Sequence, residues 1–163
     1  MLGKDGSPYR THDDVMERCG NDALVRVVRK QNGGKASALN FGVGHARGDV
    51  IVALDADTLF EPGTIPALVA PLADPRVGAV AGNAKVGNRI NLVTRWQAIE
   101  YITSQNIDRR AFALLNCITA LPGAAGAWRH RLVAAAGGFS DRTPAEDEAL
   151  TLALLRRGAH IPA

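Results

Sequence analysis

The stretch that most constrains the fold of this chain is residues 50–57, with the sequence Val-Ile-Val-Ala-Leu-Asp-Ala-Asp. Five apolar residues in a row indicate a fully buried strand of a parallel sheet, covered on both faces. The run ends in Asp55 and Asp57, and on an extended backbone this spacing puts both carboxylates on the same side. Ligands bind where strands end in open α/β sheets, so the sequence predicts a binding site here.

Two chemical interpretations of this aspartate pair remain open. Hard oxygen ligands suit Mg²⁺ or Mn²⁺, and such a metal commonly bridges to the phosphates of a substrate. Aspartate is also frequent in turns and at helix starts, so the pair is equally explained as a strand followed by a cap or a turn. The motif by itself does not separate the two.

The order of apolar segments predicts alternating strands and helices. Strands are predicted at residues 24–29, 50–55 and 77–81, with helices at 35–46 and 62–72 between them. This alternation is typical of α/β layering with right-handed crossovers. Further helices are predicted at residues 11–18, 90–115, 131–136 and 145–157, and a Gly/Ala/Pro loop or bent strand at 118–128.

Composition limits the classes of protein to which the chain can belong. Its 163 residues, 47% hydrophobic and 21% charged, are enough for one globular domain with a real core. The net charge of +3 suits an anionic ligand but is too small to indicate nucleic acid. Cys19 and Cys117 lack metal-ligand spacing and are expected as free thiols. The sequence has no signal peptide and no uninterrupted apolar run of about 18 residues, so no membrane span is predicted.

Two polar segments outside the aspartate pair could also carry chemistry. Gly-Gly-Lys at residues 33–35 precedes a predicted helix, and backbone N–H groups together with the ammonium of Lys35 suit a diphosphate. It is not a Walker P-loop, because Arg29 and Ala36 stand where that loop needs Gly and Ser or Thr. A plain helix start is the alternative explanation.

Glu146 and Asp147 form the second segment, at the start of the last predicted helix. Paired acids there are commonly cap residues. If they face a metal-diphosphate site, one of them could act as a general base and deprotonate a hydroxyl that attacks a phosphate-bearing carbon. The metal would then stabilise the departing diphosphate.

Five motifs, taken in order, resemble family 2 glycosyltransferases. They are Lys-Ala-Ser-Ala-Leu-Asn at 35–40, Asp-Ala-Asp at 55–57, Pro-Gly-Ala-Ala-Gly-Ala-Trp-Arg at 122–129, Gly-Gly-Phe at 137–139 and Ala-Glu-Asp at 145–147. The resemblance covers residues from about 24 to 163 and is strongest to the processive membrane branch, which makes poly-N-acetylglucosamine, chitin, hyaluronan and cellulose. The segments at 80–83 and 97–101 are most similar to poly-N-acetylglucosamine synthase-type enzymes.

The resemblance implies a GT-A-type α/β fold, a Rossmann-like mixed sheet flanked by helices. Residues 1–163 would form one catalytic-domain piece, with a nucleotide-sugar-binding part at 24–89 and an acceptor-binding and catalytic-base part at 90–163. The implied reaction is an inverting, metal-assisted transfer from a UDP-sugar, with UDP-N-acetylglucosamine as the expected donor and a growing polysaccharide as the acceptor. The implied roles are nucleotide binding for Lys35 and Asp55, Mg²⁺ or Mn²⁺ binding for Asp57, the catalytic base for Asp147 with Glu146 beside it, and the acceptor channel for Gly123 and Gly126.

The chain also departs from the family pattern at both ends. The family's second strand ends in Asp-Asp-Gly-Ser, whereas this chain has Lys-Asp-Gly-Ser at 4–7, so Asp5 is expected to be the surviving nucleotide contact. The family's first strand and the Gln-x-x-Arg-Trp motif are not found. The chain is therefore expected to be an internal, soluble piece, truncated at both ends, from the cytosolic domain of an inner- or plasma-membrane protein. Unpaired strand edges and apolar surface favour self-association of such a piece.

Two other functions remain open from the sequence. A truncated, non-catalytic α/β module would bind no nucleotide in a metal-dependent way. A nonprocessive transferase or a nucleotidyltransferase of the same fold would use the same residues, and the latter would take a nucleoside triphosphate. The sugar and its linkage depend on the shape of the pocket and are not encoded in these motifs.

Overall fold

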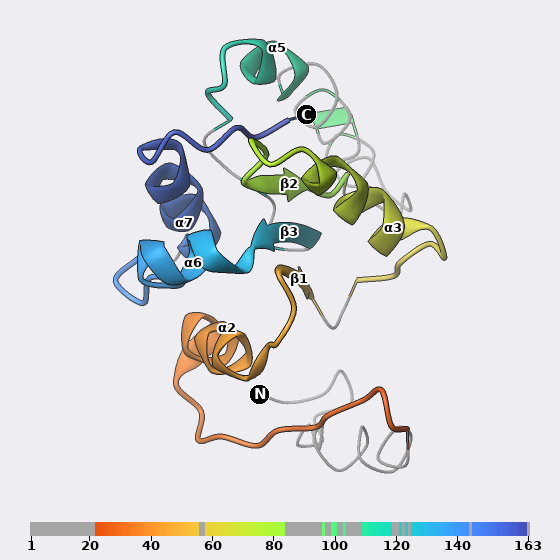
Figure 1. The fold of residues 1–163 in the computed structure, drawn as a ribbon, viewed down its shortest axis with the longest axis vertical. Coiled ribbons are helices and arrows are strands. Elements are labelled where there is room, and N and C mark those ends of the chain that lie inside the picture. The colour runs from red at the N-terminus through yellow and green to blue at the C-terminus, as the bar shows by residue number, and fades with distance from the viewer. Residues whose placement is uncertain are drawn as a thin grey trace. The chain divides into compact units, whose positions relative to one another are not determined.

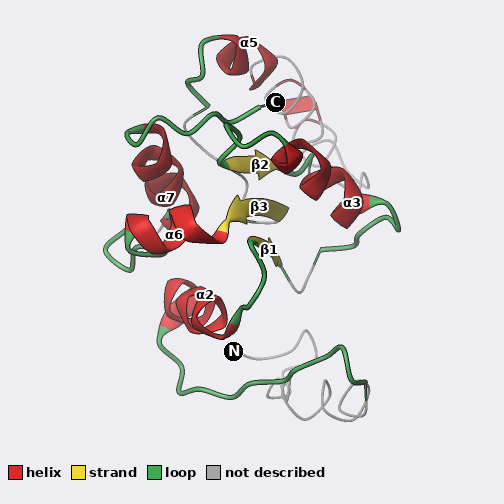
Figure 2. Cartoon of the chain, viewed as in Figure 1, coloured by secondary structure: helices red, strands yellow, loops and turns green. Residues whose placement is uncertain are grey.

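The computed structural model of the chain describes residues 22–55, 58–83, 96, 99, 100, 103, 109–118, 121, 123, 125–143 and 145–162. The chain divides into two units, Met1–Asn32 and Gly33–Ala163, and every labelled helix and strand belongs to the second. In the first unit, residues 22–32 form a turn and irregular chain (Figure 2). The strand predicted at residues 24–29 is therefore wrong. A strand needs a partner edge, and none of the described strands pairs with this segment.

The described strands form a three-stranded sheet in the order β1-β3-β2 (Figure 1). Strands β1 (Val50–Leu54) and β2 (Ala79–Ala81) both pair antiparallel with β3 (Ala125–Arg129). Strands β1 and β2 thus run in the same direction, as the β-α-β pattern predicts, but β3 lies between them. The expectation that residues 50–55 lie in a parallel sheet is wrong for these pairings, because an apolar run does not report the direction of the neighbouring strand. The expected full burial is wrong as well: every residue of β1 is partly exposed, and Leu54 is 38% exposed, because β1 is an edge strand of the described sheet.

The continuous apolar sequence of β1 is explained by packing on both faces of the sheet. On one face, Val50 and Val52 pack against a small apolar cluster. This cluster contains residues of α3 (Thr64–Val69) and of the 3₁₀-helix η1 (Ala70–Ala73), together with Val80 and Ala127. Ile51 and Ala53 pack on the other cluster, which contains Trp128 and residues of α2 (Gly34–His45), α6 (His130–Ala136) and α7 (Glu146–Leu155). The sheet is the middle layer of three, as expected for an α/β fold.

Most predicted elements of the second unit are confirmed within a few residues. Helix α2 matches the prediction at 35–46, α3 with η1 matches 62–72, β2 lies within 77–81 and α6 matches 131–136. Helix α7 ends at Leu155, before the predicted end at residue 157, and Gly158 follows with a φ of 78°. Residues 118–128, predicted as a loop or bent strand, contain most of β3, the central strand of the described sheet.

The long helix predicted at residues 90–115 lies largely outside the described residues. Within it, Trp96, Ile99 and Glu100 are helical, and α5 (Arg109–Leu114) forms its end. The helix predicted at residues 11–18 lies wholly outside them. None of the helices in the described ranges is long and apolar enough to cross a membrane.

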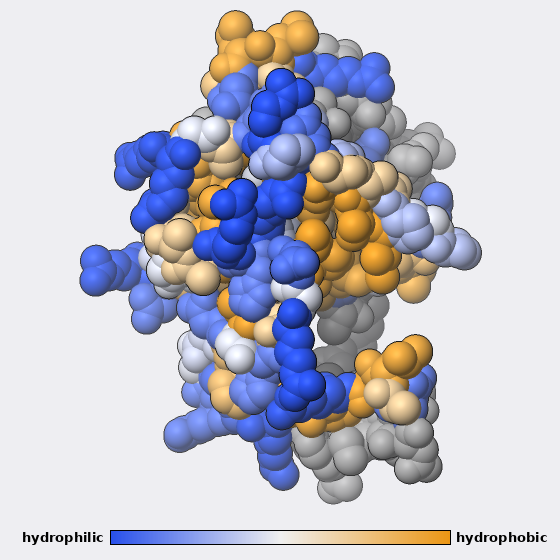
Figure 3. All heavy atoms as spheres, viewed as in Figure 1, coloured by the Kyte–Doolittle hydropathy of each residue, from blue (hydrophilic) through white to orange (hydrophobic). Residues whose placement is uncertain are grey.

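Exposed apolar side chains gather on and after α5. Phe112, Leu114 and Leu115 are 51%, 88% and 78% exposed. Figure 3 shows apolar atoms at this end of the second unit. Exposed patches of this kind mark contact surfaces, so self-association of the chain stays a prediction.

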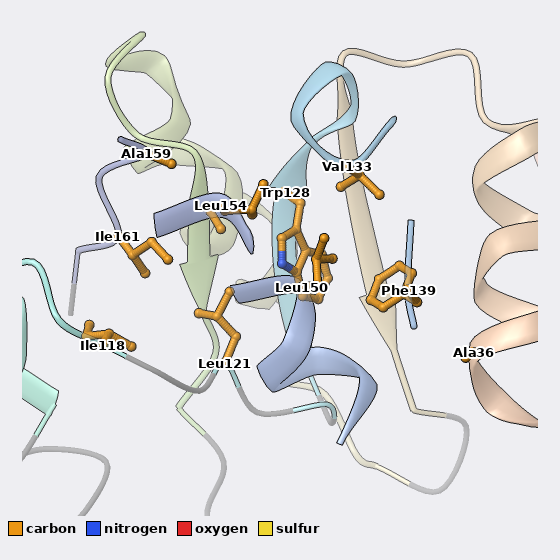
Figure 4. Packing of buried hydrophobic residues seen from close by; sticks show 11 residues of the cluster. Ala36, Ile118, Leu121, Trp128, Val133, Phe139, Leu150, Leu154, Ala159 and Ile161 are labelled. Atoms are coloured by element: carbon orange, nitrogen blue, oxygen red, sulfur yellow. The ribbon is translucent and has the colours of Figure 1, made fainter. Parts of the chain in front are cut away.

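Trp128 is the centre of the larger core cluster (Figure 4). It is 1% exposed, and the ring of Phe139 meets it edge to face, with the ring centroids 5.7 Å apart. Gly126 lies beneath the indole ring, and a Cβ atom at that position would overlap the ring carbons of Trp128. The glycine is therefore required for the packing of the core.

Arg129 ties the end of β3 to the turn that precedes β2. Its Nε atom donates to the carbonyl of Val77 at 2.7 Å, and its Nη2 atom donates to the carbonyls of Leu72 and Asp74 at 2.7 and 2.6 Å. A charged donor thus satisfies three backbone acceptors that are part-buried. Hydrogen bonds to charged groups contribute more to stability than neutral ones.

We expect Arg129→Met to lower the free energy of unfolding by about 2–4 kcal/mol, because the carbonyls lose their donors while the aliphatic stem is kept. Urea unfolding followed by circular dichroism measures this. Arg131→Met, at an exposed position two residues on, is the matched control and should change stability by less than about 0.5 kcal/mol. Equal effects of the two substitutions would contradict the assigned role of Arg129.

Candidate functional site

The register of the sheet brings several sequence-predicted residues to one edge. Leu54 pairs with Ala125, and Ala81 pairs with Gly126, so β1 and β2 end where β3 begins. Asp55 directly follows β1, and Gly123 lies two residues before β3. Because β3 pairs antiparallel with β1, the end of β1 lies beside the start of β3, which the glycine-rich segment precedes.

The ammonium group of Lys35 joins three elements at this edge. Its Nζ atom lies 3.0 Å from Oδ1 of Asp55 and 3.5 Å from Oε1 of Glu146. Lys35 is in the first turn of α2, Asp55 directly follows β1, and Glu146 is the first residue of α7. Glu146 is buried, with 9% of its surface exposed, whereas the Lys35 side chain is 46% exposed and can be reached from solvent.

Asp147 and Lys35 both face Gly123. A Cβ atom built on Gly123 would lie 2.9 Å from Nζ of Lys35 and 3.0 Å from Oδ2 of Asp147. The other carboxylate oxygen of Asp147, Oδ1, accepts a hydrogen bond from the backbone N–H of Glu148 at 2.9 Å. The carboxylate is thus oriented by its own helix, and Oδ2 is the oxygen that faces the shared space above Gly123.

The charges of this cluster act on one another. Burial lowers the pKa of Lys35, but its hydrogen bond to Asp55 and the negative charges of Asp55 and Glu146 outweigh burial, so the pKa is raised overall. Lys35 is therefore an ammonium at neutral pH. Three acidic side chains, those of Asp55, Glu146 and Asp147, thus lie near this one ammonium group.

The structure describes the local geometry at the two helix starts. Gly33 is the N-cap of α2, and no side chain caps it, so the Gly-Gly-Lys segment opens a helix as predicted and its role in diphosphate binding stays a prediction. At the other start, Ala145 is the N-cap of α7, and Glu146 lies in the acidic first turn, where it also pairs with Lys35. Asp147 accepts a hydrogen bond from the N–H of Glu148 in the first turn of α7, and its other carboxylate oxygen faces Gly123.

Two of the predicted site residues, Asp5 and Asp57, lie outside the described residues. Among the described residues, no group of three or more His, Cys, Asp or Glu side chains is placed to hold a metal ion. Asp55 nonetheless supplies a carboxylate two positions from Asp57, and hard oxygen ligands of this kind fit Mg²⁺ or Mn²⁺. Metal binding through Asp57 stays a prediction.

Gly126 belongs to the core more clearly than to the site. It is buried, and the space above its Cα atom is filled by the indole ring of Trp128. Gly82, which no site motif includes, is equally constrained, because a Cβ there would lie 2.7 Å from that of Ala125. The acceptor-channel role implied for Gly126 is untested, whereas its packing role is explained by these contacts.

The comparisons with known proteins agree with this architecture. The sequence profile described as "Glycosyl transferase family 2" matches residues 2–160. The poly-beta-1,6-N-acetyl-D-glucosamine synthase of Staphylococcus aureus is 28% identical over 162 residues, which are 99% of this chain and 39% of that protein. The probable glycosyltransferase YdaM of Bacillus subtilis is 35% identical over an alignment of 167 positions, which covers 99% of this chain and 40% of that protein.

A solved structure shares the fold. It is the mannosyltransferase PcManGT from Pyrobaculum calidifontis in complex with GDP-Man and Mn²⁺, with a TM-score of 0.75 and 24% identity, covering 95% of this chain and 42% of that one. At this identity the likeness shows the fold alone, and it confirms the predicted GT-A-type α/β class. The chain spans about two fifths of the length of the curated relatives it matches. The profile match over nearly the whole sequence shows that this chain belongs to glycosyl transferase family 2.

Proposed function

We propose that this chain carries the central part of the catalytic site of an enzyme that transfers a sugar from a nucleotide-sugar to the hydroxyl of a sugar acceptor, with inversion at the anomeric carbon. The observation that carries the proposal is the meeting of Lys35, Asp55, Glu146 and Asp147 around Gly123. These residues come from four separate sequence motifs, and family membership makes sugar transfer the reaction they would serve.

The donor would bind on the side of Lys35 and Asp55. The ammonium of Lys35 is half-exposed and paired with carboxylates, so it can exchange a carboxylate for a diphosphate oxygen without losing an opposite charge. Asp57 would hold Mg²⁺ or Mn²⁺, and the metal would supply positive charge to the departing diphosphate. N-acetylglucosamine is the expected sugar, in keeping with the name of the staphylococcal relative, and UDP is the proposed nucleotide.

The acceptor would bind in the space above Gly123. Oδ2 of Asp147 would take the proton of the acceptor hydroxyl as its oxygen forms the new bond to the anomeric carbon and the bond to the diphosphate breaks. A single displacement of this kind inverts the carbon and needs no covalent intermediate. The absence of a side chain at Gly123 leaves the approach to Asp147 open. A growing polysaccharide is the proposed acceptor.

Calorimetric titration of UDP into this chain, with and without Mn²⁺, tests the donor site. We expect binding that requires the metal and that is lost in Asp57→Ala, because one carboxylate fewer cannot hold the cation on the diphosphate. Asp49→Ala, which changes an exposed aspartate before β1, is the matched control and should bind as the unmodified chain does.

Comparing UTP with a UDP-sugar as the substrate separates a nucleotidyltransferase from a sugar transferase. Metal-independent binding, or no binding, would contradict the proposal for this chain.

A further inference from the structure

Two of the sequence motifs contact each other through residues that the site does not use. Asn40, at the end of the motif at residues 35–40, donates from Nδ2 to the carbonyl of Phe139 at 2.8 Å. The backbone N–H of Phe139 donates back to Oδ1 of Asn40 at 2.7 Å. One amide side chain thus satisfies both backbone groups of a residue 99 positions away.

The turn at residues 137–139 is shaped to receive this side chain. Gly137 and Gly138 have φ values of 87° and 82°, a region that glycine adopts without strain. A Cβ atom at Gly138 would overlap Oδ1 of Asn40, so position 138 requires glycine for steric reasons as well. Phe139 is 3% exposed, and Figure 4 shows it in the core cluster on the side of the helix that carries Ala36.

The Asn40–Phe139 contact joins α2 to the turn at residues 137–139, which precedes α7 in the chain. Helix α2 carries both Asn40 and Lys35, and residues 140–145 connect Phe139 to the start of α7, where Glu146 and Asp147 lie. The ion pair of Lys35 with Glu146 joins α2 to α7 itself, but at 3.5 Å and with a half-exposed lysine it is too weak to fix their spacing alone. The Asn40–Phe139 pair is part-buried and bidentate, so it is the stronger constraint.

We propose that Asn40 is a positioning residue: by docking the turn at residues 137–139 on α2, it sets the distance between Lys35 on the donor side and the carboxylates of α7. The proposal deepens the proposed function and rests on it for the catalytic consequence. Asn40 contacts neither donor nor acceptor in this scheme and acts through the placement of Lys35, Glu146 and Asp147.

Asn116 provides a matched control within the same chain. Its Nδ2 atom donates to the carbonyl of Ala159 at 3.1 Å, and its Oδ1 atom accepts from the N–H of Ile161 at 3.0 Å. It thus makes the same kind of two-sided backbone clamp, but on the segment after α7. Asn→Asp at either position keeps the acceptor and removes the donor, so the two variants lose the same type of bond.

The test measures the labelling rate of Lys35 by an amine reagent, by mass spectrometry, with Lys30 as the internal reference. In Asn40→Asp we expect Lys35 to react about two- to five-fold faster relative to Lys30, which corresponds to the loss of a half-exposed ion pair. Asn116→Asp should leave the labelling ratio of Lys35 to Lys30 unchanged. In Gly138→Ala, the new methyl group would displace the side chain of Asn40, so this variant should reproduce the effect of Asn40→Asp.

Steady-state kinetics provide a second measurement, which would not change if Asn40 only stabilised the fold. We expect Asn40→Asp to lower kcat by about 10–100-fold with the KM for the donor unchanged, because a small displacement of the base from the donor costs rate and not donor affinity. If Asn40→Asp leaves the labelling ratio of Lys35 to Lys30 unchanged, the inference is overturned, even if the chain binds UDP. The inference is also overturned if Asn40→Asp unfolds the chain while Asn116→Asp leaves it folded.

If the labelling ratio changes but the chain binds no nucleotide, the role of Asn40 in placing the helices is kept and the proposed function is rejected.

Discussion

Asp147→Asn is expected to abolish sugar transfer while nucleotide binding is retained. The substitution keeps the size of the side chain and an oxygen that can accept from the N–H of Glu148, but it removes the negatively charged oxygen that faces Gly123. General base catalysis contributes about 10²–10⁴-fold to such reactions, so kcat should fall by that factor. Transfer from a radiolabelled UDP-sugar to an oligosaccharide acceptor measures kcat, and calorimetry measures UDP affinity.

Glu148→Gln is the control for this substitution. Glu148 lies in the same first turn of α7 and carries the same charge, but its side chain is exposed. It should change the potential at the helix start without changing the base, so transfer should continue at nearly the rate of the unmodified chain. Equal losses in the two variants would show that charge at the start of α7, and not a base at Asp147, supports the reaction.

Gly123→Ala is expected to have the second-largest effect, and to separate catalysis from stability. The new methyl group would contact Nζ of Lys35 and Oδ2 of Asp147, so these two groups would have to move apart. Both atoms are the ends of flexible side chains, so the fold can yield at little cost, and the free energy of unfolding should change by less than about 0.5 kcal/mol. The displaced base and ammonium should lower kcat by about 10²-fold.

Gly63→Ala is the matched glycine control. Gly63 has a φ of −88° and open space where its Cβ atom would lie, so an alanine should fit without contact. Urea unfolding and the transfer assay on the two variants complete the comparison. A Gly123→Ala chain with full activity would mean that the shared space above Gly123 is not where the reaction takes place.

Local structure in the second unit was predictable from sequence because it is encoded by neighbouring residues. The helical spacing of apolar residues in α2 and the glycines that end α6 and α7 act over a few positions. The prediction for residues 24–29 failed for the opposite reason. A β-rich run forms a strand only beside a partner, and the described strands supply none for it.

The candidate site could be predicted in part for a related reason. The motifs that contain Lys35, Asp55 and Asp147 indicated ligand chemistry by residue type and by their place at element ends. No motif indicated that Gly126 lies under Trp128 or that Arg129 donates to three backbone carbonyls. These contacts depend on which side chains the folded sheet brings together, and no local pattern records them.

The sequence by itself determined the family, the α/β class and the positions of helices α2, α3, α6 and α7, because motif order and periodicity are properties of the linear chain. Only the tertiary structure decided that β3 lies between β1 and β2, and that insertion brings the start of β3 to the end of β1, which Asp55 follows. It also decided that Glu146 pairs with Lys35 and that Asn40 holds Phe139 across 99 residues. Such pairings form when both faces of the sheet are covered and the helices are packed, so their geometry follows from the whole fold.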